Sequence, residues 1–400
     1  MNAANKLALY GGEPVRRTPL PYGRQWIDEA DISAVEKALR SDFITTGPLV
    51  EHYEQAFSAA VGAGHAVAVN SGTAALHTAV AALGIGAGDQ VITTPMTFAA
   101  SANCILYRGA EPVFADVDAQ TLNISPERVE EVLTSRTKAV IAVDFTGQPC
   151  DYRALREIAD RRGIPVIEDA AHALGAVYGG RKIGTLNEVT CFSTHPVKHI
   201  TTAEGGMAVT DDPELAAKMR AFRNHGITVD FREREKTGGW LYEIEELGYN
   251  YRLPDVLCAL GLSQLGKLEG WLARRREIAR RYTEAFGEME GFAPLTIHEP
   301  EKAAWHIYLI LLDLNSLNAD RPEIFRALRA EGIGVNVHYI PVHYHPVYRN
   351  LGYRRGLCPV AESAYERIIT LPLFPKMNDD DVEDVVRAVK KVMEYYITRR

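Results

Sequence analysis

A single lysine lies where its surroundings could give it chemistry. Lys198 sits in a short segment with Pro196 before it and the pair Gly205-Gly206 after it. The segment joins two apolar runs, 189–192 and 207–210, that we expect to form buried strands. A lysine held at such a boundary is partly desolvated, which lowers its pKa and allows the neutral amine to form a Schiff base. An ordinary surface lysine beside a turn is the alternative, and it is the commoner situation for a lone lysine.

A glycine among small hydroxyl residues follows the first strand of a regular pattern. Residues 70–76 read Asn-Ser-Gly-Thr-Ala-Ala-Leu and lie between an expected strand, 66–69, and an expected helix, 74–83. The free N–H groups and the positive dipole end of a helix N-terminus bind phosphate or carboxylate groups. A plain helix cap, with Ser71 or Thr73 accepting a backbone hydrogen bond, explains the segment equally well.

Two carboxylates follow another short apolar strand. Glu168 and Asp169 come directly after the expected strand 165–167 and precede Ala170-Ala171-His172. The carboxyl ends of parallel strands form the edge at which α/β sheets bind ligands. Asp169 is the better candidate of the two because it lies one step further out of the strand. Capping of a following helix is again the alternative.

These three features together match one cofactor. Pyridoxal phosphate needs an anchor for its phosphate, a carboxylate for its protonated ring nitrogen and a lysine for its imine. The segment 70–76, Asp169 and Lys198 offer these parts in that order along the chain. The combination predicts a pyridoxal-phosphate site, although each feature alone has a simpler explanation.

The elements expected around these residues alternate in type. Short apolar runs rich in β-branched residues are each followed by a stretch of helical periodicity. The strands are expected at 66–69, 90–93, 112–115, 139–143 and 165–167, and the helices at 74–83, 98–107, 126–134 and 152–162. This pattern predicts right-handed βαβ units and a buried parallel sheet.

The rest of the chain predicts a smaller second domain. A long helical pattern opens at Pro254 and runs to about residue 286, and a helix of that length commonly joins two domains. Beyond it we expect strands at 307–312 and 334–339 and helices at 322–330, 360–368 and 378–396. The predicted organisation is an N-terminal arm (1–27), a large cofactor-binding domain (28–265) and a small C-terminal α+β domain (266–400).

The motifs resemble those of a known family. Segments 71–76, 168–172, 193–198 and 204–206 are similar to motifs of the DegT/DnrJ/EryC1/StrS sugar aminotransferases, as are 223–226, 248–252 and 337–339. The resemblance extends from the Thr45-Thr46-Gly47-Pro48 loop to the C-terminal helix. It implies a fold-type I pyridoxal-phosphate-dependent transferase, whose large domain has a mostly parallel central sheet flanked by helices.

The resemblance also assigns roles around the cofactor. It implies that Lys198 is the Schiff-base lysine and that Asp169 pairs with the pyridine nitrogen. The phosphate would be held by four residues, Gly72, Thr73, Ala74 and Ser193, the first and third through their backbone.

Further roles concern the ring, the partner subunit and the substrate. Phe98 would stack on one ring face and His172 would lie close to the ring. Asn250 would reach the phosphate of the cofactor in the other subunit, so a homodimer with shared active sites is implied. The expected substrate contacts are Thr46, His338 and Tyr339.

The form of two segments points to a substrate. Residues 195–198 and 337–346 most resemble the branch of the family that serves pseudaminic acid biosynthesis. This implies transfer of an amino group from L-glutamate to C4 of a UDP-linked 4-keto-6-deoxy-N-acetylhexosamine. Another UDP- or dTDP-linked keto-sugar is the nearest rival, and a non-catalytic, cofactor-binding sensory protein is a third reading. The candidates for contact with the nucleotide diphosphate are Arg232, Arg234 and Arg252.

Composition argues against several other classes. The net charge of −8 disfavours nucleic acid or an anionic membrane as a partner, because both require a positive surface. No run of about 18 apolar residues occurs, so no membrane-spanning helix is expected. The five cysteines are scattered and include no Cys-x-x-Cys pair, which favours reduced thiols in a cytoplasmic protein.

Two clusters of charged or titratable residues have plainer explanations. His338, His343 and His345 could suggest a metal, but no supporting cysteine or carboxylate spacing accompanies them, and substrate contact is favoured. The arginines 274–276, 280 and 281 are expected to line a solvated helix face.

Overall fold

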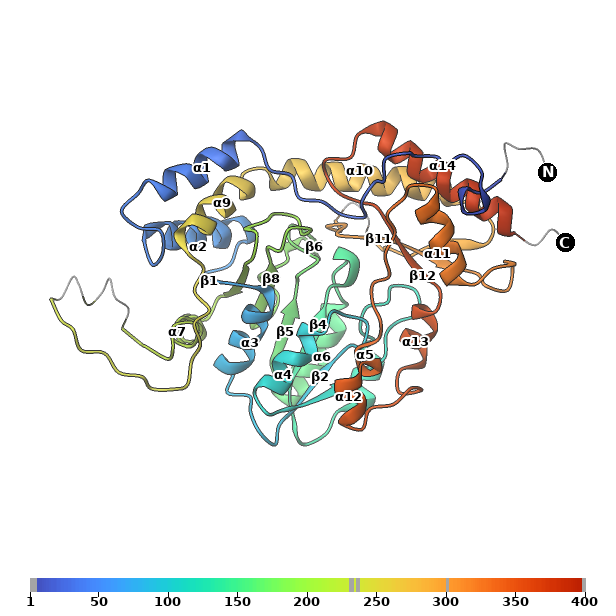
Figure 1. Cartoon of the computed structure of the whole chain (residues 1–400). Coiled ribbons are helices and arrows are strands. Elements are labelled where there is room, and N and C mark those ends of the chain that lie inside the picture. The colour runs from blue at the N-terminus through green and yellow to red at the C-terminus, as the bar shows by residue number, and fades with distance from the viewer. Residues whose placement is uncertain (1–5, 230–233, 235–237, 300–301, 398–400) are drawn as a thin grey trace.

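A seven-stranded sheet forms the centre of the protein. The computed structural model describes residues 6–229, 234, 238–299 and 302–397, whose arrangement is shown in Figure 1. The strand order is β1-β9-β8-β5-β4-β2-β3. The strands are β1 His65–Val69, β2 Gln90–Thr93, β3 Glu111–Phe114, β4 Thr137–Val143, β5 Val166–Asp169, β8 Val189–Ser193 and β9 Gly206–Thr210. All seven coincide with apolar runs that the sequence analysis assigned to strands.

Strand β9 is the exception to the parallel arrangement. It pairs antiparallel with β1 on one side and with β8 on the other, whereas β8, β5, β4, β2 and β3 run parallel to one another. Adjacent antiparallel strands need no crossover helix. Residues 194–205 therefore connect β8 to β9 as a loop, and this loop places Lys198 at the same edge of the sheet as the end of β5.

Helices cover both faces of the sheet because side chains alternate along each strand. Val67 and Ile141 pack into a core that includes α3 and α4, whereas Ala68 and Val140 pack on the opposite face with α2 and α6. The helices of this part are α1 Glu29–Leu39, α2 Pro48–Val61, α3 Gly72–Ala82, α4 Ala100–Tyr107, α5 Pro126–Val132, α6 Tyr152–Arg162 and α7 Pro213–Phe222. A hairpin of β6 Val177–Tyr178 and β7 Arg181–Lys182 was not predicted.

The long helix expected from Pro254 onwards is two helices. Helix α9 spans Asp255–Leu265 and α10 spans Leu268–Phe286, so the single-helix prediction was wrong. Glycine has a low helix propensity, and Gly266 ends α9. Lys267, which follows Gly266 between the two helices, is held by ion pairs to Asp28 and Asp31.

Helix α10 contributes side chains to two cores. Leu272 packs into the core beneath the large sheet, whereas Tyr282 and Phe286 pack into a second core of C-terminal residues. Figure 1 shows α10 running along one side of the molecule from α9 towards α14. The division at residues 265 and 266 stays a prediction.

A three-stranded antiparallel sheet organises the C-terminal part. Its strands are β10 Phe292–Pro294, β11 Tyr308–Leu312 and β12 Ile368–Leu371, and its helices are α11 Arg321–Ala330, α12 Pro346–Asn350, α13 Pro359–Tyr365 and α14 Asp379–Tyr396. The predicted strand at 334–339 was wrong, since only Asn336 makes an isolated bridge, to Thr370. The predicted helix at 360–368 ends at Tyr365, because the buried run from Ile368 forms β12 instead.

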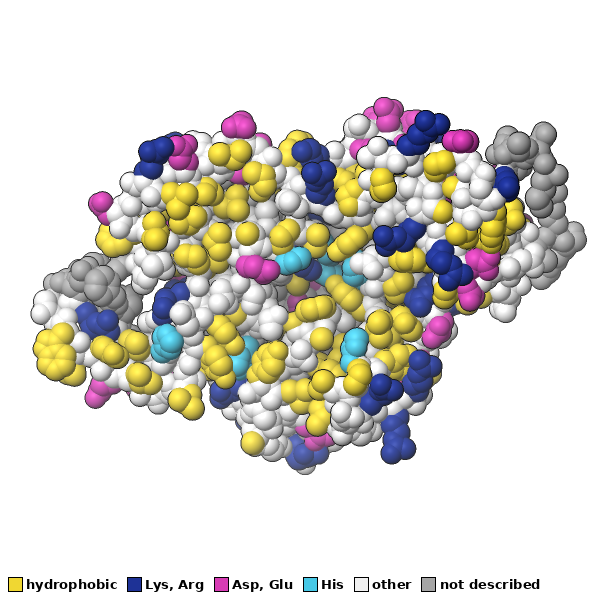
Figure 2. Space-filling model, in the orientation of Figure 1, with side chains coloured by type: hydrophobic (Ala, Val, Ile, Leu, Met, Phe, Trp, Pro, Cys, Tyr) yellow, Lys and Arg dark blue, Asp and Glu magenta, His cyan; other side chains and the backbone are white. Residues whose placement is uncertain are grey.

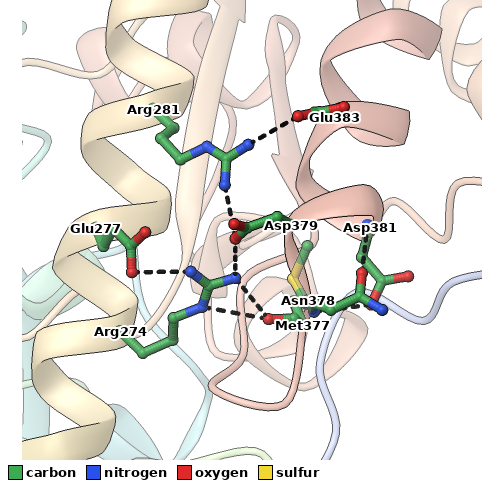
Figure 3. A network of polar contacts seen from close by, with 8 residues as sticks. All are labelled: Arg274, Glu277, Arg281, Met377, Asn378, Asp379, Asp381 and Glu383. Atoms are coloured by element: carbon green, nitrogen blue, oxygen red, sulfur yellow. Dashed lines mark hydrogen bonds and ion pairs between the residues drawn. The ribbon is translucent and has the colours of Figure 1, made fainter.

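The arginines of α10 do not form a uniformly solvated face. Arg274 and Arg281 both reach Asp379 in the first turn of α14, and Figure 3 shows this network between the two helices. Arg275 is 1% exposed and donates hydrogen bonds to the backbone carbonyls of Trp305, His306 and Leu373. The expectation of a solvated face was therefore wrong for Arg275, whose charge is satisfied by backbone oxygens inside the protein.

Two features of composition can be compared with the structure. All five cysteines are buried and none forms a disulfide. None of the helices within the described ranges is both long and apolar enough to cross a membrane.

Candidate active site

Lys198 lies in a loop closed by backbone hydrogen bonds. Thr194 N–H donates to the Gly205 carbonyl and Thr202 N–H donates to the Thr194 carbonyl, at 3.0 and 2.9 Å. The side chain of Lys198 is half-buried, and its Nζ lies 3.5 Å from Nε2 of His306. The pKa of Lys198 is lowered to about 8, chiefly by burial; the charge of Asp169 raises it and that of Arg275 lowers it, and both effects are smaller. A lysine of this kind has a substantial neutral fraction near pH 8.

Asp169 ends β5 at the same edge of the sheet. Its Oδ2 accepts a 2.6 Å hydrogen bond from Ser101 Oγ, and its Oδ1 accepts one from Ala171 N–H at 3.2 Å. Burial raises the pKa of Asp169, while these two donors and the nearby charge of Lys198 lower it. The carboxylate is thus held in place and lies close enough to Lys198 for the two charges to interact.

Four buried histidines surround the lysine. His172, His199, His306 and His338 have pKa values well below the usual histidine value, chiefly because burial disfavours their charged forms, and that of His338 is about 4. The rings of His172 and His306 lie 4.3 Å apart. In Figure 2, which colours histidines cyan, several histidine side chains reach the visible face, but the four discussed here are buried. At neutral pH these rings are uncharged, so they add no repulsion against the ammonium form of Lys198.

The N-terminus of α3 meets the end of β8. Ser71 caps the helix, because its Oγ accepts a 3.0 Å hydrogen bond from Ala74 N–H. Of the two hydroxyls considered from sequence, Ser71 is therefore the cap, and Thr73 is left as the hydroxyl that could face a ligand. A Cβ on Gly72 would lie 2.8 Å from Cβ of Ser193, and a Cβ on Gly206 would lie 2.5 Å from the Ser71 carbonyl oxygen. The glycines allow this close approach, which brings the first N–H groups of α3 to Ser193.

Only some of the residues expected to contact the cofactor ring or the substrate lie together near Lys198. Tyr339 Oη lies 3.0 Å from Nε2 of His172, and the ring of His338 is adjacent to that of Tyr339. Phe98 is 62% exposed, with its ring centre 6.3 Å from that of Tyr339. His343, by contrast, is buried against Glu362, to which it is hydrogen-bonded, and does not join this cluster.

Thr46 and Asn250 lie elsewhere in this chain. Thr46 lines a pocket of about 620 Å³ together with Asn224 and Arg252. Asn250 is exposed and its backbone bridges Asn224, next to that pocket. Of the candidate diphosphate contacts, Arg252 donates to Asn224 Oδ1 at 2.7 Å.

The other two candidate diphosphate contacts come earlier in the sequence. Arg234 stacks over the ring of Tyr242. Arg232 lies outside the described residues. Within the described parts of the chain, no group of three or more His, Cys, Asp or Glu side chains has the arrangement of a metal site.

Sequence reasoning missed four residues of the site, one of which, His199, directly follows Lys198 in the chain. Ser101 is four residues after Thr97 and three after Phe98 on the segment leading into α4, a spacing that could have marked it as facing the same way. His306 and Arg275 come from the C-terminal part and from α10, more than 70 residues from Lys198 along the chain. No local pattern identifies them, since only the packing of the two cores brings them to the lysine.

A lysine, a strand-end carboxylate and an open helix N-terminus at one edge of this sheet define a pyridoxal-phosphate-dependent enzyme of fold type I. The chain belongs to the DegT/DnrJ/EryC1/StrS aminotransferase family, whose shared pattern matches residues 25–390. It is 45% identical to the spore coat polysaccharide biosynthesis protein SpsC of Bacillus subtilis over 378 residues, which cover 94% of this chain and 97% of SpsC.

Two solved structures are similar over nearly their whole length. PseC of Helicobacter pylori, an aminotransferase involved in the biosynthesis of pseudaminic acid, superposes with a TM-score of 0.88 at 32% identity, covering 94% of this chain and 100% of PseC. The pyridoxal-phosphate form of Spr1654 from Streptococcus pneumoniae gives 0.88 at 33% identity, covering 95% and 100%. This chain is thus a pyridoxal-phosphate-dependent sugar aminotransferase, and its fold is the one predicted.

The residues at this edge of the sheet fit the cofactor. Three buried histidine nitrogens, Nδ1 of His172, His199 and His306, have no hydrogen-bond partner in the described chain. Buried polar atoms without partners are costly unless a ligand or water reaches them. The site is therefore polar, and some of its buried polar atoms need a ligand as partner. It is surrounded by the N-terminus of α3, the carboxylate of Asp169 and Lys198.

Proposed function

We propose that this protein transfers the amino group of L-glutamate to C4 of a UDP-linked 4-keto-6-deoxy-N-acetylhexosamine, as in pseudaminic acid biosynthesis. The observation that carries the amino-transfer chemistry is the meeting of Lys198 and Asp169 at one edge of the sheet. The likeness to PseC over nearly the whole chain supports the choice of substrate.

In this proposal the roles of Asp169 and Lys198 depend on whether each side chain is protonated. Pyridoxal phosphate, when bound, supplies an aldehyde carbon and an electron-accepting ring. The carboxylate of Asp169, whose ionised form is favoured by the hydrogen bond from Ser101, would keep the proton on the ring nitrogen. Lys198, whose lowered pKa leaves a neutral fraction, would accept the proton from the donor carbon that bears nitrogen and pass it to the aldehyde carbon of the cofactor within the same half-reaction. In the second half it would move a proton the opposite way, to C4 of the acceptor sugar.

Other residues would position the cofactor. Thr73, Ser193 and the backbone N–H groups of Gly72 and Ala74 are proposed to hold the phosphate, because the close approach at Gly72 brings these groups together. Phe98 would cover one face of the ring, and His172, fixed by Tyr339, would lie against the other.

We further propose that the active sites are shared in a homodimer. Thr46 and Asn250 are proposed ligands, yet they belong to a surface around the 620 Å³ pocket and not to the Lys198 cluster. Exposed apolar side chains lie on α1 and on the segments just before and after it: Ile27, Ile32, Leu39, Phe43 and Ile44. A second copy that covers them would bring Thr46 and Asn250 of one subunit to the cofactor of the other.

A cytoplasmic location is part of the proposal. All five cysteines are buried and unpaired, which suits a reducing compartment.

Nucleotide-linked sugars and L-glutamate are the partners that the proposed reaction requires.

A second substrate class has its own support. The identity to SpsC, 45%, is higher than that to PseC, 32%, and the name of SpsC refers to a spore coat polysaccharide. Another UDP- or dTDP-linked keto-sugar is therefore the alternative acceptor. The amino-transfer chemistry would be the same, and only the contacts to the sugar and nucleotide would differ.

The proposal is tested with ¹⁵N-labelled L-glutamate and a panel of UDP- and dTDP-linked 3-keto and 4-keto sugars. Mass spectrometry of the products measures incorporation of the label, with Lys198→Ala as the control. Incorporation is expected for the UDP-linked 4-keto-6-deoxy-N-acetylhexosamine in preference to the other sugars. Preference for another sugar would favour the alternative, and no incorporation into any sugar would contradict amino transfer to this class of acceptor.

A further inference from the structure

Two buried carboxyl groups lie on the face of the sheet opposite Asp169. Glu168 precedes Asp169 in β5, so its side chain points to the other face. It pairs with Ala142 of β4, and Asp144 follows two residues later on the same face. Both side chains, Glu168 and Asp144, are 0% exposed. Glu168 belongs to the motif that supplies Asp169, but the proposed reaction gives it no role.

One oxygen of each carboxyl group has donors and the other has none. Thr190 Oγ1 donates to Glu168 Oε2 at 2.6 Å. Asp144 Oδ1 accepts from Tyr152 Oη at 2.7 Å and from Cys150 N–H at 2.9 Å. The remaining oxygens, Glu168 Oε1 and Asp144 Oδ2, are buried and have no hydrogen-bond partner in the described chain.

Two ionised carboxylates in this arrangement would be costly. Each would leave a buried acceptor without a donor, and the like charges would repel one another in a medium of low dielectric constant. A single proton between Glu168 Oε1 and Asp144 Oδ2 removes both costs. Burial raises the pKa of each group, and for Asp144 the charge of Glu168 adds to the effect.

The groups that face the pair are neutral at pH 7. Cys150 and Tyr152 pack against it, and burial raises the pKa of each above its usual value. Thr190 donates to Glu168 and lowers its pKa. The buried side-chain amide of Asn187 also acts to lower this pKa, although neither of its polar atoms has a hydrogen-bond partner in the described chain. The neighbouring groups therefore contribute no positive charge, and only a shared proton would reduce the negative charge of the pair.

The pair stands directly behind the active site. Asp144 N–H donates to the Asp169 carbonyl at 3.1 Å, and His306 N–H donates to the Thr146 carbonyl at 2.8 Å. Thr146 has φ of 62°, a conformation that a threonine keeps only when its surroundings hold it. Phe145 packs against the ring of His172, with centres 6.2 Å apart. Asp144 thus begins a turn that contacts Asp169, His306 and His172.

We propose that Asp144 and Glu168 share one proton and act as a positioning pair, which holds the ends of β4 and β5 so that Asp169 and His306 face the cofactor. The proposal rests on the proposed role of Asp169. Because the pair carries one negative charge and not two, Asp169 is left as the carboxylate whose charge faces the pyridine ring.

Amide substitutions test the shared proton. In Glu168→Gln the amide oxygen still accepts from Thr190 and the NH₂ group donates to Asp144 Oδ2. In Asp144→Asn the amide oxygen accepts from Tyr152 and the NH₂ group donates to Glu168 Oε1. Each single change replaces the shared proton by a hydrogen bond, so Tm should change little. In the double variant two NH₂ groups oppose each other, and Tm should fall by more than the sum of the single changes.

Glu54→Gln is the matched control for burial. Glu54 is 8% exposed but is paired with Arg223, so its amide substitution breaks an ion pair and should lower Tm by itself. All Tm values are measured on the cofactor-free protein, so this test does not depend on the proposed reaction. The shared proton would be contradicted if a single amide substitution lowered Tm as much as Glu168→Ala does. It would also be contradicted if the change in Tm of the double variant equalled the sum of the two single changes.

Binding of pyridoxal phosphate tests the positioning role. Well below its Tm, the double variant should bind the cofactor about tenfold or more weakly than the wild type, while each single amide binds within about twofold. Glu54→Gln, at a comparable Tm, should bind normally. Unchanged cofactor affinity in a double variant of lowered Tm would overturn the positioning role. Failure of the wild type to bind the cofactor would instead contradict the proposed function.

The pH dependence gives an independent measurement. A carboxyl pKa raised in the folded state means that the folded protein binds more protons than the unfolded chain, so this contribution to stability is lost as pH rises from about 4 through the raised pKa. The difference in Tm between Glu168→Gln and the wild type should therefore shift in favour of the variant across that range. A constant difference would overturn the shared proton.

Discussion

Ser101 donates a 2.6 Å hydrogen bond to Asp169, the carboxylate at the end of β5. Ser101 Oγ also lies 2.8 Å from Thr97 Oγ1, so a short chain of hydroxyls leads from α4 to the carboxylate. Because both Ser101 and Asp169 are buried, the donor fixes the carboxylate and favours its ionised form. The helix after β2 is thereby tied to the strand that carries the proposed partner of the pyridine nitrogen.

Ser101→Ala should weaken cofactor binding and leave the fold intact. A hydrogen bond to a charged group contributes about 1.5–3 kcal/mol, so the Kd of pyridoxal phosphate should rise about 10- to 100-fold. Loss of this donor also raises the pKa of Asp169, so the defect should grow as pH falls. Fluorescence titration of the cofactor-free protein measures the Kd. Ser41→Ala, which removes an exposed hydroxyl bonded to the Ala38 carbonyl, is the control; equal effects of the two substitutions would contradict the role of Ser101.

The capture of pyridoxal phosphate by the cofactor-free protein should depend on the pKa of Lys198. Only the neutral amine reacts with an aldehyde, and burial lowers this pKa to about 8. The rate should rise tenfold per pH unit below that value and level off above it, as followed by stopped-flow absorbance. A rate that continues to rise to about pH 10.4, the pKa of a solvated lysine, would show that Lys198 is not desolvated.

Arg275→Leu should destabilise the protein and raise the pKa of Lys198. The substitution leaves the carbonyls of Trp305, His306 and Leu373 without their donor, at a cost of about 3 kcal/mol or more. It also removes a positive charge that disfavours the ammonium form of Lys198. Urea unfolding gives the stability, and the pH dependence of cofactor capture gives the pKa.

The control for Arg275 lies on the same helix. Arg280 pairs with Glu284 at an exposed position, and Arg280→Leu should change stability by less than about 0.5 kcal/mol. It should leave the pKa of Lys198 where it is. Similar losses in the two variants would mean that Arg275 contributes no more than a surface arginine.

Gly72→Ala should reduce affinity for the phosphate group. Its Cβ would lie 2.8 Å from that of Ser193, so the N-terminus of α3 must move away from β8. We expect weaker binding of pyridoxal phosphate and little change in the binding of pyridoxal, which lacks the phosphate. Gly270→Ala is the matched control, since nothing lies within 4 Å of its Cβ position in α10 and alanine should stabilise the helix by about 0.5–1 kcal/mol. Equal losses for both ligands would place the effect elsewhere than at the phosphate.

Much of the large domain follows from local pattern. Each strand of the central sheet is a short apolar run between turn residues, and the loop that carries Lys198 was placed between β8 and β9 for that reason. Asp169 was recognisable because a carboxylate that ends a buried strand is unusual. The capping residue Ser71 could not be distinguished from Thr73, since both hydroxyls lie within reach of the same N–H groups.

The C-terminal part was harder to predict because its elements depend on packing. Residues 334–339 have the composition of a strand but do not join the small sheet. That sheet consists of β10, β11 and β12, with β11 in the centre. Arg275 lies in a run of arginines whose pattern suggests solvent, and only the neighbouring carbonyls show why it is buried. His306 reaches Lys198 across two cores, a relationship that no spacing in the sequence encodes.

The most direct test of the account is the visible absorption spectrum of the purified protein with pyridoxal phosphate, before and after addition of L-glutamate. A yellow band from the cofactor joined to Lys198 is expected; it should bleach when L-glutamate is added and be absent in Lys198→Ala. A band that persists in the presence of L-glutamate would contradict glutamate as the amino donor. A protein that forms no band, or one whose band survives in Lys198→Ala, would contradict the assignment of Lys198 on which the account depends.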